Sequence, residues 1–480
     1  IIINITYFSI ILQLGFFFAN WNLFCNFSAS LQFLYFFLQI HYNSFMSSNN
    51  FPRCFLKQKE EKEILQGFPW AFDNEILYFK HRPNEKSEWK KEDFEKCTIP
   101  NGSAVELYTN AGGFLGTGIL NRNSKISVRL ISNDHADVVF SDIENFWLQK
   151  VEDAFFIRKI NFSKKDSYRL IFGEADLIPG LICDLFCDVE GKIYLVVQFL
   201  SMSCDVFRTE ILNALLKIVK PSYIFERSDN SVREKEGLPL VAGWLNLEDA
   251  DFSLASEDDE KYFGKDNVII EENGLKLLLD ITNGQKTGYF LDQKFNRAEI
   301  KKYCKGKKVL DTFTHTGAFG LNAFAAGAKE VISVDISEDA VEIVKENIKL
   351  NNATKTNRAV CADVFDLLKK YESMNEKFDV IILDPPAFTK SAKMIEKAYG
   401  GYKEINLRAM RLLNKGGILI TCSCSYFMET NMFCDMIMHA AMDSHKKVQI
   451  LEKRGAGPDH PVLVGYPKSE YLKCVVCRVL

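Results

Sequence analysis

The sequence has almost no excess of charge of either sign. Lys and Arg number 59 and Asp and Glu number 63, so the formal net charge at pH 7 is −4. A uniformly basic protein is therefore excluded, and any nucleic-acid site must be a local patch. The hydrophobic fraction of 47% and the charged fraction of 25% exclude a disordered or collagen-like chain. At ~150 residues per domain, the length predicts about three domains.

Charged side chains are missing altogether from the first 45 residues. A membrane anchor needs ~20 apolar residues, but Asn20 and Asn22 interrupt the run, and the basic start of a signal peptide is absent. The first methionine is Met46. We therefore interpret residues 1–45 as an untranslated leader or an apolar extension, with a membrane anchor as the alternative.

The thirteen cysteines do not form the pattern of a secreted disulfide framework, because most of them lie inside apolar runs. Buried thiols of this kind favour a reducing, cytoplasmic location. Cys474 and Cys477 have a spacing seen in zinc sites, but an offset of three on a strand places them on opposite faces, and no second pair is near. We expect no metal.

Two small domains are expected before residue 246. Residues 51–135 alternate between apolar and polar side chains with Gly at the turns, which predicts a β-rich barrel or sandwich. Residues 150–245 predict an α+β module. The elements expected in this module are helices at 151–160 and 206–219 and a strand at 193–199. The strand-like segments of the β-rich domain are 68–72, 102–108, 112–121 and 126–131. The acidic residues 246–266 lack periodicity and predict a solvated linker.

Residues 268–480 show buried strands alternating with amphipathic helices, which predicts an α/β domain with a parallel sheet and helices on both faces. The strands are expected at 308–311, 331–335, 379–383 and 417–421, and helices at 338–351 and 403–413. In such sheets ligands bind at the carboxyl ends of the strands. Candidate functional residues should therefore follow each run.

Gly317, Asp335 and Asp363 follow the first three strands. Gly317 opens a turn into a helix whose N-terminus would face a ligand, but the G-x-G-x-x-G spacing is absent, which disfavours a dinucleotide dehydrogenase. A carboxylate at the end of the second strand can accept both hydroxyls of a ribose. Asp363 could accept an adenine amino group. Each acid alone could instead be a helix cap, but their repetition favours a site for an adenosine.

The next two strands end in residues suited to a reaction. Asp384 precedes two prolines that restrict the backbone, and the alternative role of this segment is to end the strand. Cys424 is a candidate nucleophile, whereas Cys422 lies deeper in the same apolar run. We expect the hydroxyls of Ser423 and Ser425 to help stabilise the Cys424 thiolate below its usual pKa.

Several motifs together resemble those of the class I S-adenosylmethionine-dependent methyltransferases with a PUA domain, which form 5-methylcytosine in large-subunit ribosomal RNA. The resemblance covers nearly the whole chain from about residue 51. It rests on GQKTGYFLDQKFNR, the strand-end acids, DPPAF and TCSCS, with KEEKEILQGFPWAFDNEI, GGFLGTGILNRNSKISVRLI, FGEADLIPGLICD and DHPVL before and after them. It implies a C-terminal Rossmann-like methyltransferase domain, preceded by a β-rich PUA-like domain and an α+β central module.

By this resemblance, Gly317, Asp335, Asp363 and Gln293 bind S-adenosylmethionine, and ribosomal RNA is the partner. Cys424 is the nucleophile that adds to carbon 6 of cytosine. Asp384 or its neighbouring carbonyl groups stabilise protonation at ring nitrogen 3. No base for the carbon 5 proton is assigned, and the second cysteine that many RNA cytosine methyltransferases carry in this motif is absent from residues 387–391.

Three points stay open at this stage. A DPP motif after the fourth strand also occurs in enzymes that methylate guanine nitrogens and need no cysteine. The chain could also be an RNA-binding protein without activity. His460 beside Asp459 could approach the substrate or cap a loop.

The absence of charge before Met46 leads to a first prediction. A chain that starts at Met46 should fold and show full methyltransferase activity, because no interaction of the predicted domains requires the leader. The activity of the two chain lengths and a peptide digest of the native protein check this. Peptides from residues 1–45 in that digest would contradict it.

Overall fold

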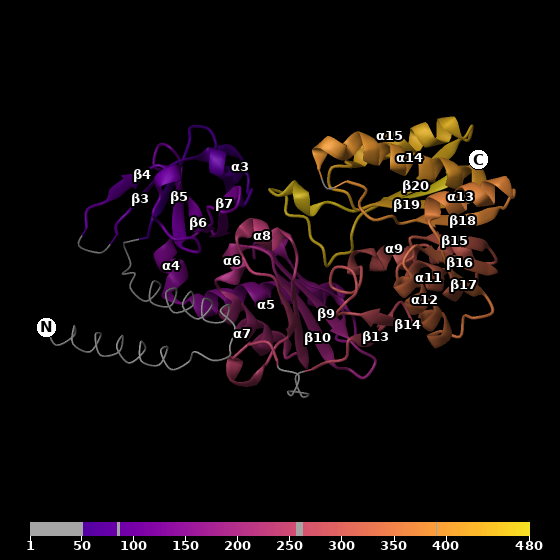
Figure 1. The fold of residues 1–480 in the computed structure, drawn as a ribbon, viewed down its shortest axis with the longest axis horizontal. Coiled ribbons are helices and arrows are strands. Elements are labelled where there is room, and N and C mark those ends of the chain that lie inside the picture. The colour runs from indigo at the N-terminus through magenta and orange to yellow at the C-terminus, as the bar shows by residue number, and fades with distance from the viewer. Residues whose placement is uncertain (1–50, 84–86, 256–262, 390) are drawn as a thin grey trace, which may run out of the picture.

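A computed structural model describes residues 51–83, 87–255, 263–389 and 391–480 (Figure 1). The interpretation of residues 1–45 therefore lies outside the described residues. Three bodies follow each other along the chain: an N-terminal sheet, a central module and a C-terminal α/β domain. Within these ranges, no helix has the length and apolar character to cross a bilayer.

The N-terminal sheet has seven strands in the order β2-β7-β6-β5-β1-β3-β4. The four segments expected from the sequence become β2, β5, β6 and β7. The strands are β1 (Arg53–Leu56), β2 (Trp70–Phe72), β3 (Ile76–His81), β4 (Lys90–Glu92), β5 (Ala104–Tyr108), β6 (Phe114–Leu120) and β7 (Ile126–Ser132), with the short helix α3 (Glu61–Leu65). The inward side chains of these strands form a core of their own.

The central module is a five-stranded sheet in the order β12-β11-β10-β9-β8. Its long helix begins at residue 143 rather than 151, because Asp142 caps it by accepting the N–H of Asn145 at 3.1 Å. The strands are β8 (Tyr168–Phe172), β9 (Leu181–Cys187), β10 (Ile193–Phe199), β11 (Tyr223–Ser228) and β12 (Val241–Trp244), and the helices are α4 (Ala136–Ser141), α5 (Ile143–Asn161), α6 (Met202–Asp205), α7 (Arg208–Val219) and α8 (Val232–Glu236).

The acidic segment expected to be a solvated linker is partly packed. Phe252 is 4% exposed and lies in the core of the central module, and Leu245 pairs with Leu254 in an isolated β-bridge. The prediction followed the acidic side chains and overlooked the apolar ones between them. Residues 256–262 of that segment lie outside the described ranges.

A two-stranded hairpin, β13 (Asn267–Glu272) and β14 (Leu275–Asp280), connects the central module to the C-terminal domain. Val189 donates its N–H to the carbonyl oxygen of Ile269 at 2.9 Å, which attaches the hairpin to the central module. Apolar side chains of both bodies and the hairpin share one buried cluster. This shared core restricts the movement of the central module relative to the C-terminal domain.

The C-terminal sheet has the order β17-β16-β15-β18-β19-β21-β20. Its strands are β15 (Lys308–Thr312), β16 (Glu330–Asp335), β17 (Asn357–Cys361), β18 (Phe378–Leu383), β19 (Leu413–Ser423), β20 (Val448–Arg454) and β21 (Lys473–Val479). The first five are parallel, as expected, but β21 runs antiparallel to both of its neighbours. The parallel expectation is therefore wrong for the last strand.

Helices cover both faces of this sheet, as predicted (Figure 1). One face packs against α13 (Val364–Ser373), α14 (Ile395–Leu412) and α15 (Thr430–Asp443). The other face packs against α10 (Lys301–Cys304) and α11 (Ala318–Ala325), with α9 (Lys294–Glu299) and α12 (Glu338–Leu350) nearby. The carboxyl ends of the five parallel strands therefore meet at one edge of the sheet.

Candidate functional site

The turn after β15 brings backbone close to this edge. Gly317 precedes α11 with φ of 80°, and a Cβ atom there would lie 3.0 Å from Val344 Cγ1. Phe313 and His315 also have positive φ, 55° and 53°. This conformation is unfavourable for Phe313 and His315 but not for a glycine, and two strained residues within one turn indicate a backbone shaped for a ligand rather than for stability.

Asp311 in β15 is a site residue that the sequence reasoning did not select. Its Oδ2 atom accepts the N–H of Gly320 at 2.9 Å and the hydroxyl of Thr314, while its Oδ1 atom is buried and has no partner among the described residues. Burial raises its pKa to about 6, against the hydrogen bonds that lower it. A buried carboxylate oxygen without a donor costs free energy unless a ligand supplies the donor.

Asp335 lies at the end of β16 and fixes the turn after β15. Its carboxylate accepts the N–H of His315 at 2.9 Å and that of Ser337 at 3.1 Å. Each oxygen retains a further acceptor position. Asp363 is exposed, follows β17 and caps α13 by accepting the N–H of Asp366 at 3.2 Å, so the helix-cap role considered for it is present.

Asp384 follows β18 and is held by a chain of amides. Gln293 Nε2 donates to Asp384 Oδ1 at 3.0 Å, and Gln293 Oε1 accepts from Asn296 Nδ2 at 2.7 Å. Asn296 Oδ1 in turn accepts from Arg454 Nε at 2.9 Å. The structure thus places Gln293 against Asp384, and Asn296 fixes which end of the Gln293 amide faces the carboxyl group.

Two neighbouring carboxyl groups have pKa values shifted in opposite directions. Burial and the negative charge of Asp292 raise the pKa of Asp384 to about 7. Burial would also raise the pKa of Asp292, but Lys286, His460 and Tyr471 outweigh it and bring the value to about 2. Near neutral pH, Asp384 therefore carries a transferable proton while Asp292 stays ionised.

The two cysteines of TCSCS occupy different environments. Cys422 is fully buried and lies opposite Cys474 in the register of β19 and β21. Cys424 follows the last residue of β19 and is partly exposed. Cys477 and Cys474 belong to the two opposite cores of the sheet, as expected from their spacing.

The prediction that the flanking hydroxyl groups stabilise the Cys424 thiolate is wrong. Ser423 donates to the Tyr402 hydroxyl at 3.0 Å, and Ser425 lies 3.1 Å from the same hydroxyl, so both turn away from the thiol. Burial raises the pKa of Cys424, and Lys286 is the cation that opposes the shift. Cys424 is therefore a neutral thiol at rest. The prediction failed because hydroxyl groups next to a thiol in the sequence can form their hydrogen bonds with other side chains.

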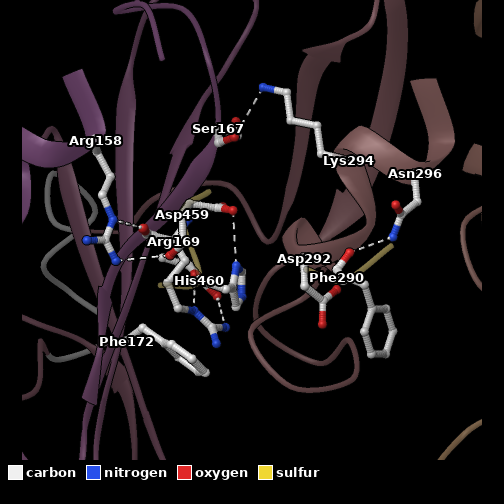
Figure 2. A network of polar contacts seen from close by, with 12 residues as sticks. Arg158, Ser167, Arg169, Phe172, Phe290, Asp292, Lys294, Asn296, Asp459 and His460 are labelled. Atoms are coloured by element: carbon white, nitrogen blue, oxygen red, sulfur yellow. Dashed lines mark hydrogen bonds and ion pairs between the residues drawn. The ribbon is translucent and has the colours of Figure 1, made fainter. Parts of the chain in front are cut away.

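Asp459 and His460 join the C-terminal domain to the central module (Figure 2). The N–H of Arg169 donates to Asp459 Oδ2 at 2.9 Å, and Arg158 Nη2 donates to the Asp459 carbonyl oxygen at 2.9 Å. His460 Nδ1 lies 3.0 Å from Asp459 Oδ1, and its ring centroid is 5.0 Å from that of Phe172. These contacts favour the loop-capping role of His460.

Two known families match this chain, one in its N-terminal part and one in its C-terminal part. Residues 260–467 match the S-adenosylmethionine-dependent methyltransferase family, and residues 55–133 match a PUA-like domain. The buried, unpartnered oxygen of Asp311 fits the ammonium group of such a cofactor. No group of three or more His, Cys, Asp or Glu side chains suited to a metal ion occurs in the ranges described.

Curated relatives cover most of the chain. A protein named ribosomal RNA large subunit methyltransferase I from Aeromonas salmonicida is 36% identical over 436 residues, which are 88% of this chain and 98% of the relative. The protein of the same name from Aliivibrio fischeri is 36% identical over 430 residues, 89% of this chain and 99% of its own.

Solved structures share the fold at lower identity. A Streptococcus mutans protein described as a SAM-dependent methyltransferase has a TM-score of 0.69 at 21% identity, with 89% of this chain and 99% of that chain covered. A methyltransferase solved with S-adenosylhomocysteine has a TM-score of 0.70, also at 21% identity and with the same coverage.

The raised pKa of Asp384 predicts a pH-dependent effect of Asp384→Asn on stability. The folded chain keeps this carboxyl protonated up to pH of about 7, above the ordinary value of 3.8. The wild type therefore loses stability as the pH rises from about 4 to about 7, and the asparagine variant lacks this loss. The melting temperature of the variant relative to wild type should rise across that range in thermal unfolding. A difference independent of pH would contradict the shift.

Proposed function

This chain belongs to the ribosomal RNA large subunit methyltransferase I family, and from that premise we propose that it methylates carbon 5 of a cytosine in large-subunit ribosomal RNA through a covalent adduct of Cys424. It is an S-adenosylmethionine-dependent methyltransferase. One observation carries the finer proposal. A partly exposed thiol and a carboxyl group that holds a proton near neutral pH follow the neighbouring strands β19 and β18 at the same edge.

The residues at the other strand ends suit the cofactor. Asp311 would hold its ammonium group, Asp335 its ribose hydroxyls and Asp363 its adenine amino group, with Gly317 leaving room for the backbone to approach. Gln293 would close the site on the side of Asp384. When bound, S-adenosylmethionine supplies an electrophilic methyl group.

The protein must first make carbon 5 of cytosine nucleophilic. The Cys424 thiol first loses its proton to solvent, which the positive charge of Lys286 favours. The thiolate then forms a bond to carbon 6, and the electron pair displaced through the ring is received at nitrogen 3, where Asp384 donates its proton. Carbon 5 then has enamine character and takes the methyl group. Loss of the carbon 5 proton to solvent restores the enamine. The nitrogen 3 proton then returns to Asp384, the double bond between carbons 5 and 6 forms again, and the bond to sulfur breaks, which frees the Cys424 thiolate.

The rest of the site favours this sequence of steps. Lys286 favours the thiolate form of Cys424, and Lys473 is a second cation whose charge interacts with this thiol. The amide chain from Arg454 through Asn296 and Gln293 keeps the Asp384 carboxyl in place. A methyltransferase acting on a guanine nitrogen would have no use for a thiol at this position, so the cysteine distinguishes the two alternatives.

Asp335→Ala should weaken binding of S-adenosylhomocysteine by roughly ten- to a hundredfold, because a hydrogen bond to a charged acceptor contributes ~1.5–3 kcal/mol. Asp335→Asn should lose less, since it keeps one oxygen for the N–H groups of the turn. Isothermal titration calorimetry measures both. RNA affinity should change far less, and unchanged cofactor affinity in the alanine variant would remove Asp335 from the site.

Cys424→Ala should abolish methyl transfer while cofactor binding stays intact. Cys422→Ala is the matched control, because it removes a thiol only two residues away. This variant should lose stability through the cavity it leaves, yet retain activity. Methyl transfer to large-subunit ribosomal RNA from cells lacking the gene measures both.

RNA carrying 5-fluorocytosine gives a direct test, because fluorine at carbon 5 prevents the release of the thiol. A covalent complex should form with the wild type and with Cys422→Ala and be absent with Cys424→Ala, as seen by denaturing gel electrophoresis. Methylation at a normal rate by Cys424→Ala would end the covalent mechanism and favour methylation of a ring nitrogen or an amino group.

A further inference from the structure

A cavity of about 320 Å³ lies between the central module and the loop before β21. The central module contributes residues of β8, β9 and β10, and the loop contributes Tyr466, Lys468, Ser469 and Tyr471. Its walls include Phe172, Asn230, Lys286, Tyr466, Lys468 and Tyr471. None of the residues proposed above to bind the cofactor or to bond to cytosine lines it, although Lys286, which favours the thiolate form of Cys424, does. The cavity is therefore distinct from the reaction site but adjoins it.

The cavity is nevertheless connected to the reaction site through Asp292. The Tyr471 hydroxyl donates to Asp292 Oδ2 at 2.5 Å, and Lys286 Nζ lies 3.9 Å from the same oxygen. The next residue, Gln293, donates to Asp384. A group bound in the cavity would therefore lie close to a base held at Asp384, as the neighbouring nucleotide of an RNA chain does.

The aromatic side chains of the cavity suit an unpaired base. Phe172, Tyr466 and Tyr471 come from two different bodies of the protein and line the same space. Every nucleobase has a flat face that stacks on such rings, and this stacking does not depend on the base. Asn230 adds an amide that can donate to and accept from a base edge.

Lys468 supplies a cation for a phosphate. It forms no ion pair with any described residue, and its Nζ lies 4.5 Å from the centroid of the Trp70 ring. The other two cations of the wall already have carboxylate partners, because Lys286 faces Asp292 and Arg169 pairs with Asp184. Glu174 also lines the cavity and lies near Lys468, but its carboxylate pairs with Arg129 at 3.2 Å. Since the chain as a whole carries no excess of positive charge, a lysine outside any ion pair of the described residues in this aromatic cavity is a local feature suited to nucleic acid.

We propose that this cavity binds one unpaired nucleotide of the RNA next to the methylated base, with the base against the aromatic side chains and the phosphate at Lys468. The inference rests on the proposed function only for the identity of the RNA. Trp70 belongs to the N-terminal sheet, so a phosphate bound at Lys468 would also lie beside the PUA-like domain. The cavity would thus connect the RNA-binding domain to the reaction site.

The experiment measures binding of full-length protein to large-subunit ribosomal RNA from cells lacking the gene, by filter binding at several salt concentrations. Lys468→Ala should weaken binding severalfold and reduce the dependence of log K on log salt by about one, as for one lost phosphate contact. Lys468→Arg should restore both. Lys349→Ala on α12 is the matched control, because it removes the same charge from an exposed position away from the cavity.

The aromatic part of the proposal needs a separate pair of variants. Tyr466→Leu keeps an apolar side chain against Phe68 and Trp70 but lacks a flat face. It should weaken RNA binding by roughly fivefold or more, and Tyr466→Phe should bind nearly as wild type. Cofactor affinity and melting temperature of all variants should stay close to wild type.

The proposal is overturned if Lys468→Ala and Tyr466→Leu bind RNA with the affinity and salt dependence of wild type, or if Lys349→Ala loses as much as Lys468→Ala. The function proposed above fails differently. Wild type that binds RNA but forms no adduct with 5-fluorocytosine would contradict the covalent mechanism and leave the nucleotide site in place.

Discussion

Two buried arginines of the central module determine where the loop between β20 and β21 lies. Arg158 pairs with Asp176 at 2.6 Å and Arg169 with Asp184 at 2.7 Å. The Arg158 guanidinium also donates to the Asp459 carbonyl oxygen of that loop, and the backbone N–H of Arg169 donates to the Asp459 carboxylate. A guanidinium is tolerated in the interior only when it is paired, and removal of one partner from a buried pair costs ~3–5 kcal/mol. The ion pairs hold the two arginines in place, and the loop is fixed by the hydrogen bonds that these arginines donate to Asp459.

The position of that loop sets the charge distribution at the reaction site. The N–H of Gly457 donates to the Asp292 carbonyl oxygen at 2.9 Å, and Tyr471 binds its carboxylate. Arg169 and His460 contribute to the low pKa of Asp292, and the resulting negative charge raises the pKa of Asp384. The central module thus supplies no reacting group, yet it adjusts the protonation of one.

The sequence predicted the parts of the site that depend on local pattern. Asp335, Asp384 and Cys424 lie at strand ends as expected, because apolar runs mark the parallel strands and the strand ends follow directly from the runs. The antiparallel β21 was missed since an apolar run does not reveal strand direction. The buried Phe252 was missed because acidic neighbours dominate its segment.

Contacts between distant parts of the chain could not be predicted. The low pKa of Asp292 depends on its hydrogen bond with Tyr471. The orientation of the Asn296 side chain, and through it that of Gln293, depends on Arg454. Both partners lie more than a hundred residues away in the sequence. Nothing in the local pattern distinguishes these side chains from solvated ones. Asp311 could have been found, since it stands in a strand with the same character as the selected acids, but its unpaired oxygen is visible only in three dimensions.

The place of β21 in the sheet has a consequence for how the protein is made. This strand follows both β19 and β20 in the sequence, yet it lies between them in the sheet. While residues 473–479 are still within the ribosome, the hydrogen-bonding edge of β19 has no partner, and Cys422 lacks the neighbour that buries it. The methyltransferase domain can therefore complete its sheet only after synthesis of its final strand, so the newly made chain passes through a stage in which this edge must be kept from pairing with other chains.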